Sequence, residues 1–263
     1  MRIVVCVKQV YDPKTVKISR SREELDLRDA VKIFNPPDKY ALEAALRLRE
    51  AAGAEVIALT VGGPEAEDVA HEAVAIGADK AILVTGEPAS TPAMQAVQLP
   101  ASNIVTNLLA AAIVRLGAEL VLTGHAGLTD GAGSLAPRLA AALDWPVLLD
   151  VVRLTADAAG LTAIVAGANG GEAAPVPAPA VIAILPGSER PRYPHPARIA
   201  NAWNEGMVEV WTAADLGVAD LAPDTELSGL ILGPERVRGQ VIKGTMQEAA
   251  AELAGVLKSR RLI

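Results

Sequence analysis

Short apolar runs alternate with amphipathic stretches through the first 145 residues of the chain. Four runs are almost wholly apolar, as in strands that are covered on both faces: residues 3–7, 55–61, 80–84 and 119–123. Each run is followed by a stretch with helical spacing of its apolar positions: 36–50, a segment opening at Pro64, 102–116, and a segment ending near 143. Because parallel neighbours need crossover helices, this alternation predicts an α/β fold with a doubly wound, mostly parallel sheet.

The start of the first helix carries signals of its own. Asn35 is suited to cap the helix and Pro36 to occupy its first position, and Asp38 stands three residues after the cap, as in a capping box. The pattern explains Asp38 almost entirely as part of a helix cap. Earlier in the chain, Val16 and Ile18 alternate with polar neighbours, which predicts a short edge hairpin.

The second half of the chain has a different pattern. Three stretches have the composition of strands but no helix between them, which predicts an antiparallel extension of the sheet: 147–154, 161–166 and 179–185. Prolines crowd residues 186–198, so neither a helix nor a central strand is expected there. The chain from about residue 211 is predicted to be irregular until one last helix with a single apolar stripe: Met246, Ala250, Leu253, Ala254 and Leu257. This helix either folds back on the chain or clasps another one.

Composition narrows the classes of function. The 263 residues are 51% hydrophobic and carry a net charge of -7 without a basic cluster, so a nucleic-acid-binding protein is not expected. One cysteine excludes an internal disulfide and a cysteine-based zinc or iron–sulfur site, and it favours a reduced, cytoplasmic setting. No apolar run approaches the roughly 20 residues of a membrane span, and no secretory signal is visible, so we expect no membrane insertion.

The segment from Gly124 to Leu135 is the richest candidate for ligand binding. Its four glycines allow backbone amides to approach a ligand closely, and a predicted helix follows with its positive end: Gly124, Gly127, Gly131 and Gly133. The segment matches neither the Walker pattern nor GxGxxG. The residues alone leave two interpretations open, a nucleotide phosphate site and an ordinary strand-to-helix connection.

The other reactive side chains indicate no catalytic or metal site. Cys6 lies within an apolar strand and is predicted to be a core residue, not a nucleophile. His71 falls in an acidic helix and is expected to be solvated, and His195 lies between prolines in a surface loop. His125 stands beside the glycine-rich segment, where a phosphate contact and a plain surface role are both open. The sequence therefore indicates a binder of a reactive cofactor, without catalytic residues of its own.

Six segments spread over nearly the whole chain carry a resemblance to a known family: RIVVCVKQVYDPKTVKI (2–18), FNPPDKYALEAALRLRE (34–50), EVIALTVGGPEAEDVAHEAVAIGADKAILV (55–84), ELVLTGHAGLTDGAGSLAPRLAAALDWP (119–146), PRYPHPARIANA (191–202) and GPERVRGQVIKGTMQEAAAELAGVLKSRRLI (233–263). In this order the resemblance is to the beta subunit family of electron-transfer flavoproteins. It implies a fold related to adenine-nucleotide hydrolases and three parts. These are a nucleotide-binding α/β domain (1–190), a Pro-rich recognition loop with an irregular segment (191–232), and an arm that clasps the alpha subunit (233–263).

The resemblance also implies a nucleotide site. Its residues would be Cys6, Asn35, Pro36, Pro37, Asp38, Val61, Gly124, His125, Ala126, Gly127, Leu128, Thr129, Asp130, Gly131, Ala132, Gly133, Ser134 and Leu135. In the family the redox FAD is held mainly by the alpha subunit, and the beta subunit binds AMP or, in bifurcating members, a second FAD. The AMP-binding branch has an acid cluster followed by Asn-Gln-Thr where this chain has Gly131, Gly133 and Ser134.

The implied function is electron transfer. The partners that the resemblance implies are an alpha subunit, flavin dehydrogenases such as acyl-CoA dehydrogenases, and a quinone reductase; a bifurcating member would use NADH and ferredoxin. The alternative from another class is a free-standing adenine-nucleotide sensor of the same fold superfamily. Such a sensor would need neither the arm nor the Pro-rich loop.

Overall fold

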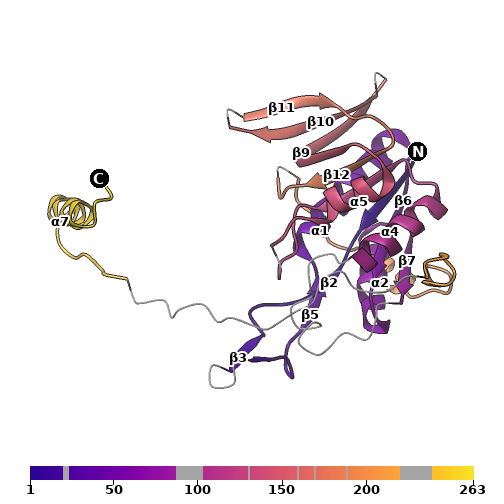
Figure 1. Ribbon diagram of the computed structural model, residues 1–263, viewed down its shortest axis with the longest axis horizontal. Coiled ribbons are helices and arrows are strands. Elements are labelled where there is room, and N and C mark those ends of the chain that lie inside the picture. The colour runs from indigo at the N-terminus through magenta and orange to yellow at the C-terminus, as the bar shows by residue number, and fades with distance from the viewer. Residues whose placement is uncertain are drawn as a thin grey trace. The chain divides into compact units, whose positions relative to one another are not determined.

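The computed structural model describes residues 1–19, 24–86, 103–129, 131–158, 160–168, 170–187, 189–219 and 239–263. The chain divides into two units, Met1–Gly229 and Leu230–Ile263. Among the described residues of the first unit, nine strands form one sheet in the order β11-β10-β9-β12-β8-β1-β6-β7-β13 (Figure 1). The strands are β1 (Arg2–Cys6), β6 (Glu55–Val61), β7 (Lys80–Thr85), β8 (Leu120–Gly124), β9 (Val147–Asp157), β10 (Gly160–Gly167), β11 (Gly170–Pro175), β12 (Ala180–Ile184) and β13 (Val208–Thr212).

Crossover helices connect the parallel strands. They are α1 (Pro36–Ala52), α2 (Glu67–Ile76) after the 3₁₀ turn η1 (Pro64–Ala66), α4 (Asn103–Leu116) and α5 (Leu135–Leu143). Strand β1 pairs in parallel with β6 on one side and with β8 on the other, so successive strands are added first to one side and then to the other. The α/β fold with a mostly parallel sheet is thereby confirmed; the relation to adenine-nucleotide hydrolases stays a prediction.

The two faces of the sheet have separate cores. Ile3 and Val5 of β1 pack with α1 and α2, whereas Val4 and Cys6 pack with α4 and α5 on the opposite face. Alternate side chains of a strand point to opposite faces, so a strand covered on both sides must be apolar at every position. This is why the continuous apolar runs in the sequence predicted the central strands correctly.

The antiparallel extension is only partly as predicted. Strands β9, β10 and β11 pair antiparallel at one edge of the sheet, and β11 was not predicted from the sequence. The predicted strand 179–185 does not belong to this extension: β12 returns to the parallel part and lies between β8 and β9. The burial of all five β12 residues gives the reason, since a strand so uniformly apolar is stable only with neighbours and cover on both sides.

The region after β12 is more ordered than the sequence predicted. Helix α6 (Pro196–Ala202) begins inside the Pro-rich stretch, and β13 pairs in parallel with β7. A proline at the first helical position loses no hydrogen bond, so the expectation of no helix in 186–198 was wrong at its end. His195 precedes the helix, and its Nδ1 accepts a hydrogen bond from the Ala197 amide at 3.3 Å.

His71 on α2 is buried, so the prediction that it is solvated was wrong. Its Nδ1 hydrogen-bonds the carbonyl oxygen of Ala202 at 2.7 Å, and its ring stacks on Trp203 with 3.9 Å between ring centroids. Helix α6 covers this side of α2, which the acidic composition of α2 alone did not indicate.

Two short sheets lie between β1 and α1. They are formed by β2 (Gln9–Tyr11) with β5 (Lys32–Phe34), and by β3 (Lys17–Ser19) with β4 (Glu24–Asp26). The predicted hairpin around Ile18 is confirmed as the β3–β4 pair. It stands apart from the main sheet, toward the lower edge of Figure 1.

The second unit contains the predicted last helix, α7 (Met246–Ser259). Thr245 and Glu248 form a capping box, in which each side chain hydrogen-bonds the backbone amide of the other residue. Within the described part of its own unit no residue of α7 is buried, and Met246 is 91% exposed. The apolar stripe of this helix therefore has no core of its own among the described residues of the second unit.

Two neighbouring residues of α4 test the assignment of its core face. Ile113 is fully buried, whereas Val114 is 66% exposed. Ile113→Ala should lower the free energy of unfolding by about 2–5 kcal/mol, because it leaves a cavity against the sheet. Val114→Ala should change it by less than about 0.5 kcal/mol. Urea denaturation of both variants measures the difference, and equal midpoints would contradict the assigned face.

Candidate functional site

The candidate site lies at the carboxyl ends of the central strands. The order of strands reverses between β1 and β8, and ligands of doubly wound sheets bind beyond the strand ends at such a point. The segment 124–135 leaves β8 here, and the backbone at Lys8 leaves β1. Val61 ends the neighbouring strand β6, and the Gly62 amide donates to the Val84 carbonyl oxygen at 3.1 Å.

Asn35 ties the start of α1 to the glycine-rich segment. Its Nδ2 donates to the Ala126 carbonyl oxygen at 3.2 Å, and its Oδ1 accepts from the Leu128 amide at 2.9 Å. The side chain is fully buried, so these two bonds satisfy an amide that would otherwise be costly to bury. Asn35 occupies the cap position of α1 but makes no capping bond with its side chain, so the predicted capping box was wrong.

Gly124 lets the chain pass directly against the first turn of α1. A Cβ on this residue would lie 2.7 Å from the carbonyl carbon of Pro37 and 2.9 Å from the Asp38 amide nitrogen. No larger residue fits there without moving backbone. The structure therefore brings Asn35–Asp38 and the glycine-rich segment together.

The glycine-rich segment turns back on itself through two left-handed residues. Gly131 has φ +59° and Gly133 has φ +56°, conformations that side-chain-bearing residues rarely adopt. A Cβ on Gly133 would also lie 2.8 Å from the His125 carbonyl oxygen, whereas one on Gly131 would meet nothing within 4 Å. The Gly131 amide donates to the Gly127 carbonyl oxygen at 2.9 Å, which closes the turn.

Two polar atoms of the same segment are buried without hydrogen-bond partners in the described part of the chain. They are Nδ1 of His125 and Oγ1 of Thr129. Buried polar groups are almost always satisfied, so two such atoms in one turn point to a ligand or water. Asp130, which the sequence included in the site, lies outside the described residues. Ser134 precedes α5 without a side-chain capping bond, and Leu135 opens that helix.

Asp38 and Cys6 are buried beneath the edge. Asp38 is 6% exposed and its Oδ2 accepts from the Lys8 amide at 3.0 Å, so it holds β1's end and is not merely a helix cap. Burial raises the pKa of Asp38 to about 7, although hydrogen bonds from Asn35, Lys8 and Gly124 act in the opposite direction. Burial, and then the charge of Asp38, raises the pKa of the Cys6 thiol far above its usual range, which keeps it an unreactive core residue.

Two features at the carboxyl edge of the sheet were not predicted from the sequence, the contact at the end of β12 and the buried Thr60. The Ile184 carbonyl oxygen at the end of β12 accepts from the His125 amide at 3.0 Å, a contact hidden because β12 was assigned to the extension. Thr60 of β6 is 1% exposed and its Oγ1 has no hydrogen-bond partner in the described residues. The sequence carried no signal for either of these two features. It carried one for the contact between Asn35 and the glycine-rich turn, because a side-chain amide offers both a donor and an acceptor, whereas a helix cap uses only the acceptor.

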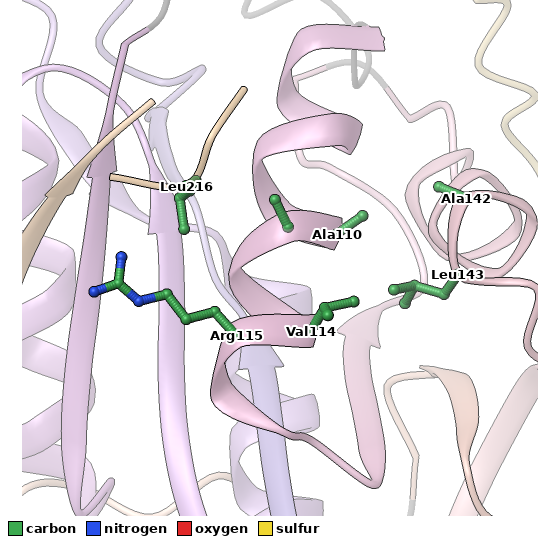
Figure 2. Close-up of a pocket in the computed structure, with 7 residues that line it drawn as sticks. Ala110, Val114, Arg115, Ala142, Leu143 and Leu216 are labelled. Atoms are coloured by element: carbon green, nitrogen blue, oxygen red, sulfur yellow. The ribbon is translucent and has the colours of Figure 1, made fainter. Parts of the chain in front are cut away.

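An apolar groove of about 520 Å³ lies between α4 and α5 (Figure 2). It is lined by Ala110, Ala111, Val114, Arg115, Ala142, Leu143 and Leu216. Its helical residues belong to the C-terminal halves of the two helices, whereas the crossover connections place the helix N-termini at the carboxyl edge of the sheet. Arg115 already donates to the Asp215 carbonyl oxygen at 2.8 Å and stacks on Trp211. The groove is therefore distinct from the glycine-rich turn.

Within the described residues, no group of three His, Cys, Asp or Glu side chains is placed to hold a metal ion. None of the helices in those ranges combines the length and the apolarity that a membrane span requires.

Comparison with known proteins gives consistent matches. A family model, the electron transfer flavoprotein domain, matches residues 26–216. The chain is 31% identical to the electron transfer flavoprotein subunit beta of Clostridium acetobutylicum, over 100% of both chains. It is 30% identical to the caffeyl-CoA reductase-Etf complex subunit CarD of Acetobacterium woodii, again over 100% of both. Protein FixA of Azorhizobium caulinodans is 31% identical over 84% of this chain and 79% of its own.

The raised pKa of Asp38 predicts a pH-dependent stability. The folded state keeps a proton that the unfolded chain releases near pH 4, so this group's contribution is full below pH 4 and is lost as the pH rises to about 7. Three pKa units correspond to about 4 kcal/mol. Asp38→Asn should flatten the curve of unfolding free energy against pH over this window. Urea midpoints from about pH 4 to about pH 8 measure both proteins; parallel curves would contradict the prediction.

Proposed function

This chain belongs to the electron transfer flavoprotein family, and we propose that it acts as the beta subunit of a heterodimeric electron carrier. In this role it carries electrons between flavin dehydrogenases, or NADH in a bifurcating complex, and a quinone reductase or ferredoxin. The family match and the likeness to proteins named as beta subunits support the role. Flavin supplies the redox chemistry when bound, and the protein's task is to bind, orient and shield it.

The turn from Gly124 to Leu135 is the proposed phosphate site of a nucleotide. The observation that carries this proposal is the turn itself, with left-handed Gly131 and Gly133 and with buried atoms of His125 and Thr129 that have no hydrogen-bond partner among the described residues. Turns with left-handed residues direct successive amides into a concave nest that suits anions. The N-terminus of α5 follows directly and adds the positive end of its dipole. These residues fit a phosphate group.

The surrounding residues have supporting roles in this proposal. Asn35 fixes the turn, and Pro36, Pro37 and Asp38 form the first turn of α1 against which Gly124 lies. Cys6 and Val61 end the neighbouring strands β1 and β6, and Cys6 lies buried in the core beneath the proposed site. In this proposal none of these residues is catalytic.

The nucleotide that this chain binds is proposed to be a second FAD in preference to AMP. Gly131 leaves open space beside the turn, and neither Gly133 nor Ser134 adds negative charge where a second phosphate would lie. The lower repulsion is a modest gain because salt screens it at an exposed turn. Gly133→Asn should then cost the heterodimer one flavin.

The proposed partners are an alpha subunit, flavin dehydrogenases such as acyl-CoA dehydrogenases, and a quinone reductase, in the cytoplasm. The apolar stripe of α7, which the described residues of its own unit do not bury, supports an arm over 233–263 that clasps the alpha subunit. The Pro-rich region from residue 191 is the proposed surface for redox partners. A free-standing adenine-nucleotide sensor is the alternative; it would bind nucleotide alone and acquire no flavin colour with an alpha subunit.

The glycine turn gives a matched set of variants. Gly133→Ala combines a left-handed φ with a methyl group against the His125 carbonyl oxygen, so nucleotide retention should fall at least about tenfold. Gly131→Ala carries only the backbone strain and should have a smaller effect. Gly53→Ala, at φ +68° after α1 and with open space around it, is the control. Gly53→Ala should lower the free energy of unfolding by about 1 kcal/mol and leave the nucleotide occupancy unchanged. Mass spectrometry of the native complexes measures the occupancy, and full retention by Gly133→Ala would exclude this turn.

Co-expression with an alpha subunit tests the heterodimer. The full chain should co-elute with the alpha subunit as a yellow complex, because the apolar stripe of α7 contributes on the order of several kcal/mol when buried. Deletion of 233–263, or Leu253→Glu in the stripe, should abolish co-elution and leave the first unit folded. Glu252→Gln on the polar face is the control. A colourless mixture of separate full-length chains would favour the sensor.

A further inference from the structure

A buried carboxylate on α1 holds the Pro-rich region in place. Glu43 is 2% exposed, and its two oxygens accept three hydrogen bonds from one residue, Arg192. The Arg192 Nε donates at 2.8 Å, its Nη2 at 3.1 Å and its backbone amide at 3.2 Å. A further Nε, from Arg47, donates to Glu43 at 2.9 Å. The carboxylate therefore fixes both the side chain and the backbone of Arg192.

The ion pair extends to the residues on either side. Arg192 also donates to Glu50, about two turns after Glu43 along α1, and Arg47 Nη2 lies 2.9 Å from Glu189. The two carboxylates raise the pKa of the Arg192 guanidinium, which keeps it charged at every accessible pH. A planar guanidinium that meets a carboxylate with two donors defines an orientation as well as a distance.

The same region is held at its other end by α2. His71 bonds the Ala202 carbonyl oxygen and stacks on Trp203, and Ala202 is 1% exposed. Between these two attachments, Tyr193 is 94% exposed and Ile199 is 46% exposed. Large apolar side chains are thus presented on a backbone that the protein fixes at both ends.

We infer that Glu43 is a positioning residue that sets the place of residues 189–203 on the surface, and so presents Tyr193 and Ile199 to a redox partner. The inference deepens the proposed function and rests on it for the identity of the partner. Stability alone does not explain the arrangement, because a buried ion pair contributes no more, on balance, than apolar residues of the same volume. What the pair provides is a defined position for the Arg192 backbone, and a rigid surface binds with less loss of conformational entropy.

The test uses the heterodimer with an alpha subunit and three variants. Arg192→Ala removes the attachment, and Arg192→Lys keeps a charge beside Glu43 but cannot reproduce the planar fork, so it folds even where the alanine variant does not. Glu72→Gln is the control, because it breaks the ion pair of Glu72 with Lys39 on α1 and leaves the hydrogen bonds of Arg192 in place. Hydrogen exchange of 189–203 is measured in each, together with flavin reduction by an acyl-CoA dehydrogenase and its acyl-CoA.

The expected result is selective. Arg192→Ala should raise the exchange rate of residues 190–195 about tenfold and the KM for the dehydrogenase to a similar degree, with kcat and flavin content unchanged. Arg192→Lys should give smaller changes of the same kind, and Glu72→Gln none. Unchanged exchange in both Arg192 variants, a fall in kcat at constant KM, or an equal effect of Glu72→Gln would overturn the inference. Absence of electron transfer in the wild type would instead refute the proposed partner, and the exchange rates would still decide the role of Glu43.

Discussion

The site depends on one side-chain amide. The glycine-rich turn after β8 has no sheet or helix of its own, and the Asn35 amide satisfies both the Ala126 carbonyl oxygen and the Leu128 amide. Asn35 is in turn fixed between β5 and the prolines that open α1. Gly124 permits this contact, because any side chain there would displace the first turn of the helix. The shape of the turn is therefore set before a ligand arrives, which is what tight phosphate binding by backbone amides requires.

Helix α1 carries more of the function than its place in the core suggests. Among the described residues, the buried acids are Asp38 and Glu43, and both belong to this helix. Its N-terminal end holds the glycine-rich turn and the end of β1, while its middle holds Arg192 of the Pro-rich region. Buried carboxyl groups add little stability. What these two provide is a fixed position for the backbone segments that they bind. The apolar face of the same helix packs in the core, and this packing offsets the free-energy cost of burying the two carboxyl groups.

The sequence predicted the features that follow from local periodicity. The four central strands and their helices were found because burial on both faces demands continuous apolar runs. Contacts between distant segments were not predictable: β12 looked like its antiparallel neighbours, and His71 looked solvated until α6 covered it. In the site, the glycines signalled a close approach, but the pattern suggested a cap for Asn35 and Asp38. Their actual partners, the loop backbone and the Lys8 amide, lie far from them in the sequence or across the edge of the sheet.

The most direct test of the account is hydrogen exchange of the heterodimer before and after its nucleotides are removed. Amides of residues 124–135 should lose protection on removal, most strongly from Gly131 to Leu135, while residues 110–116 and 142–143 at the groove between α4 and α5 should not change. The released nucleotides are counted in the same experiment. Loss of protection at the groove with an unchanged glycine-rich turn would contradict the claim that this turn holds the phosphate.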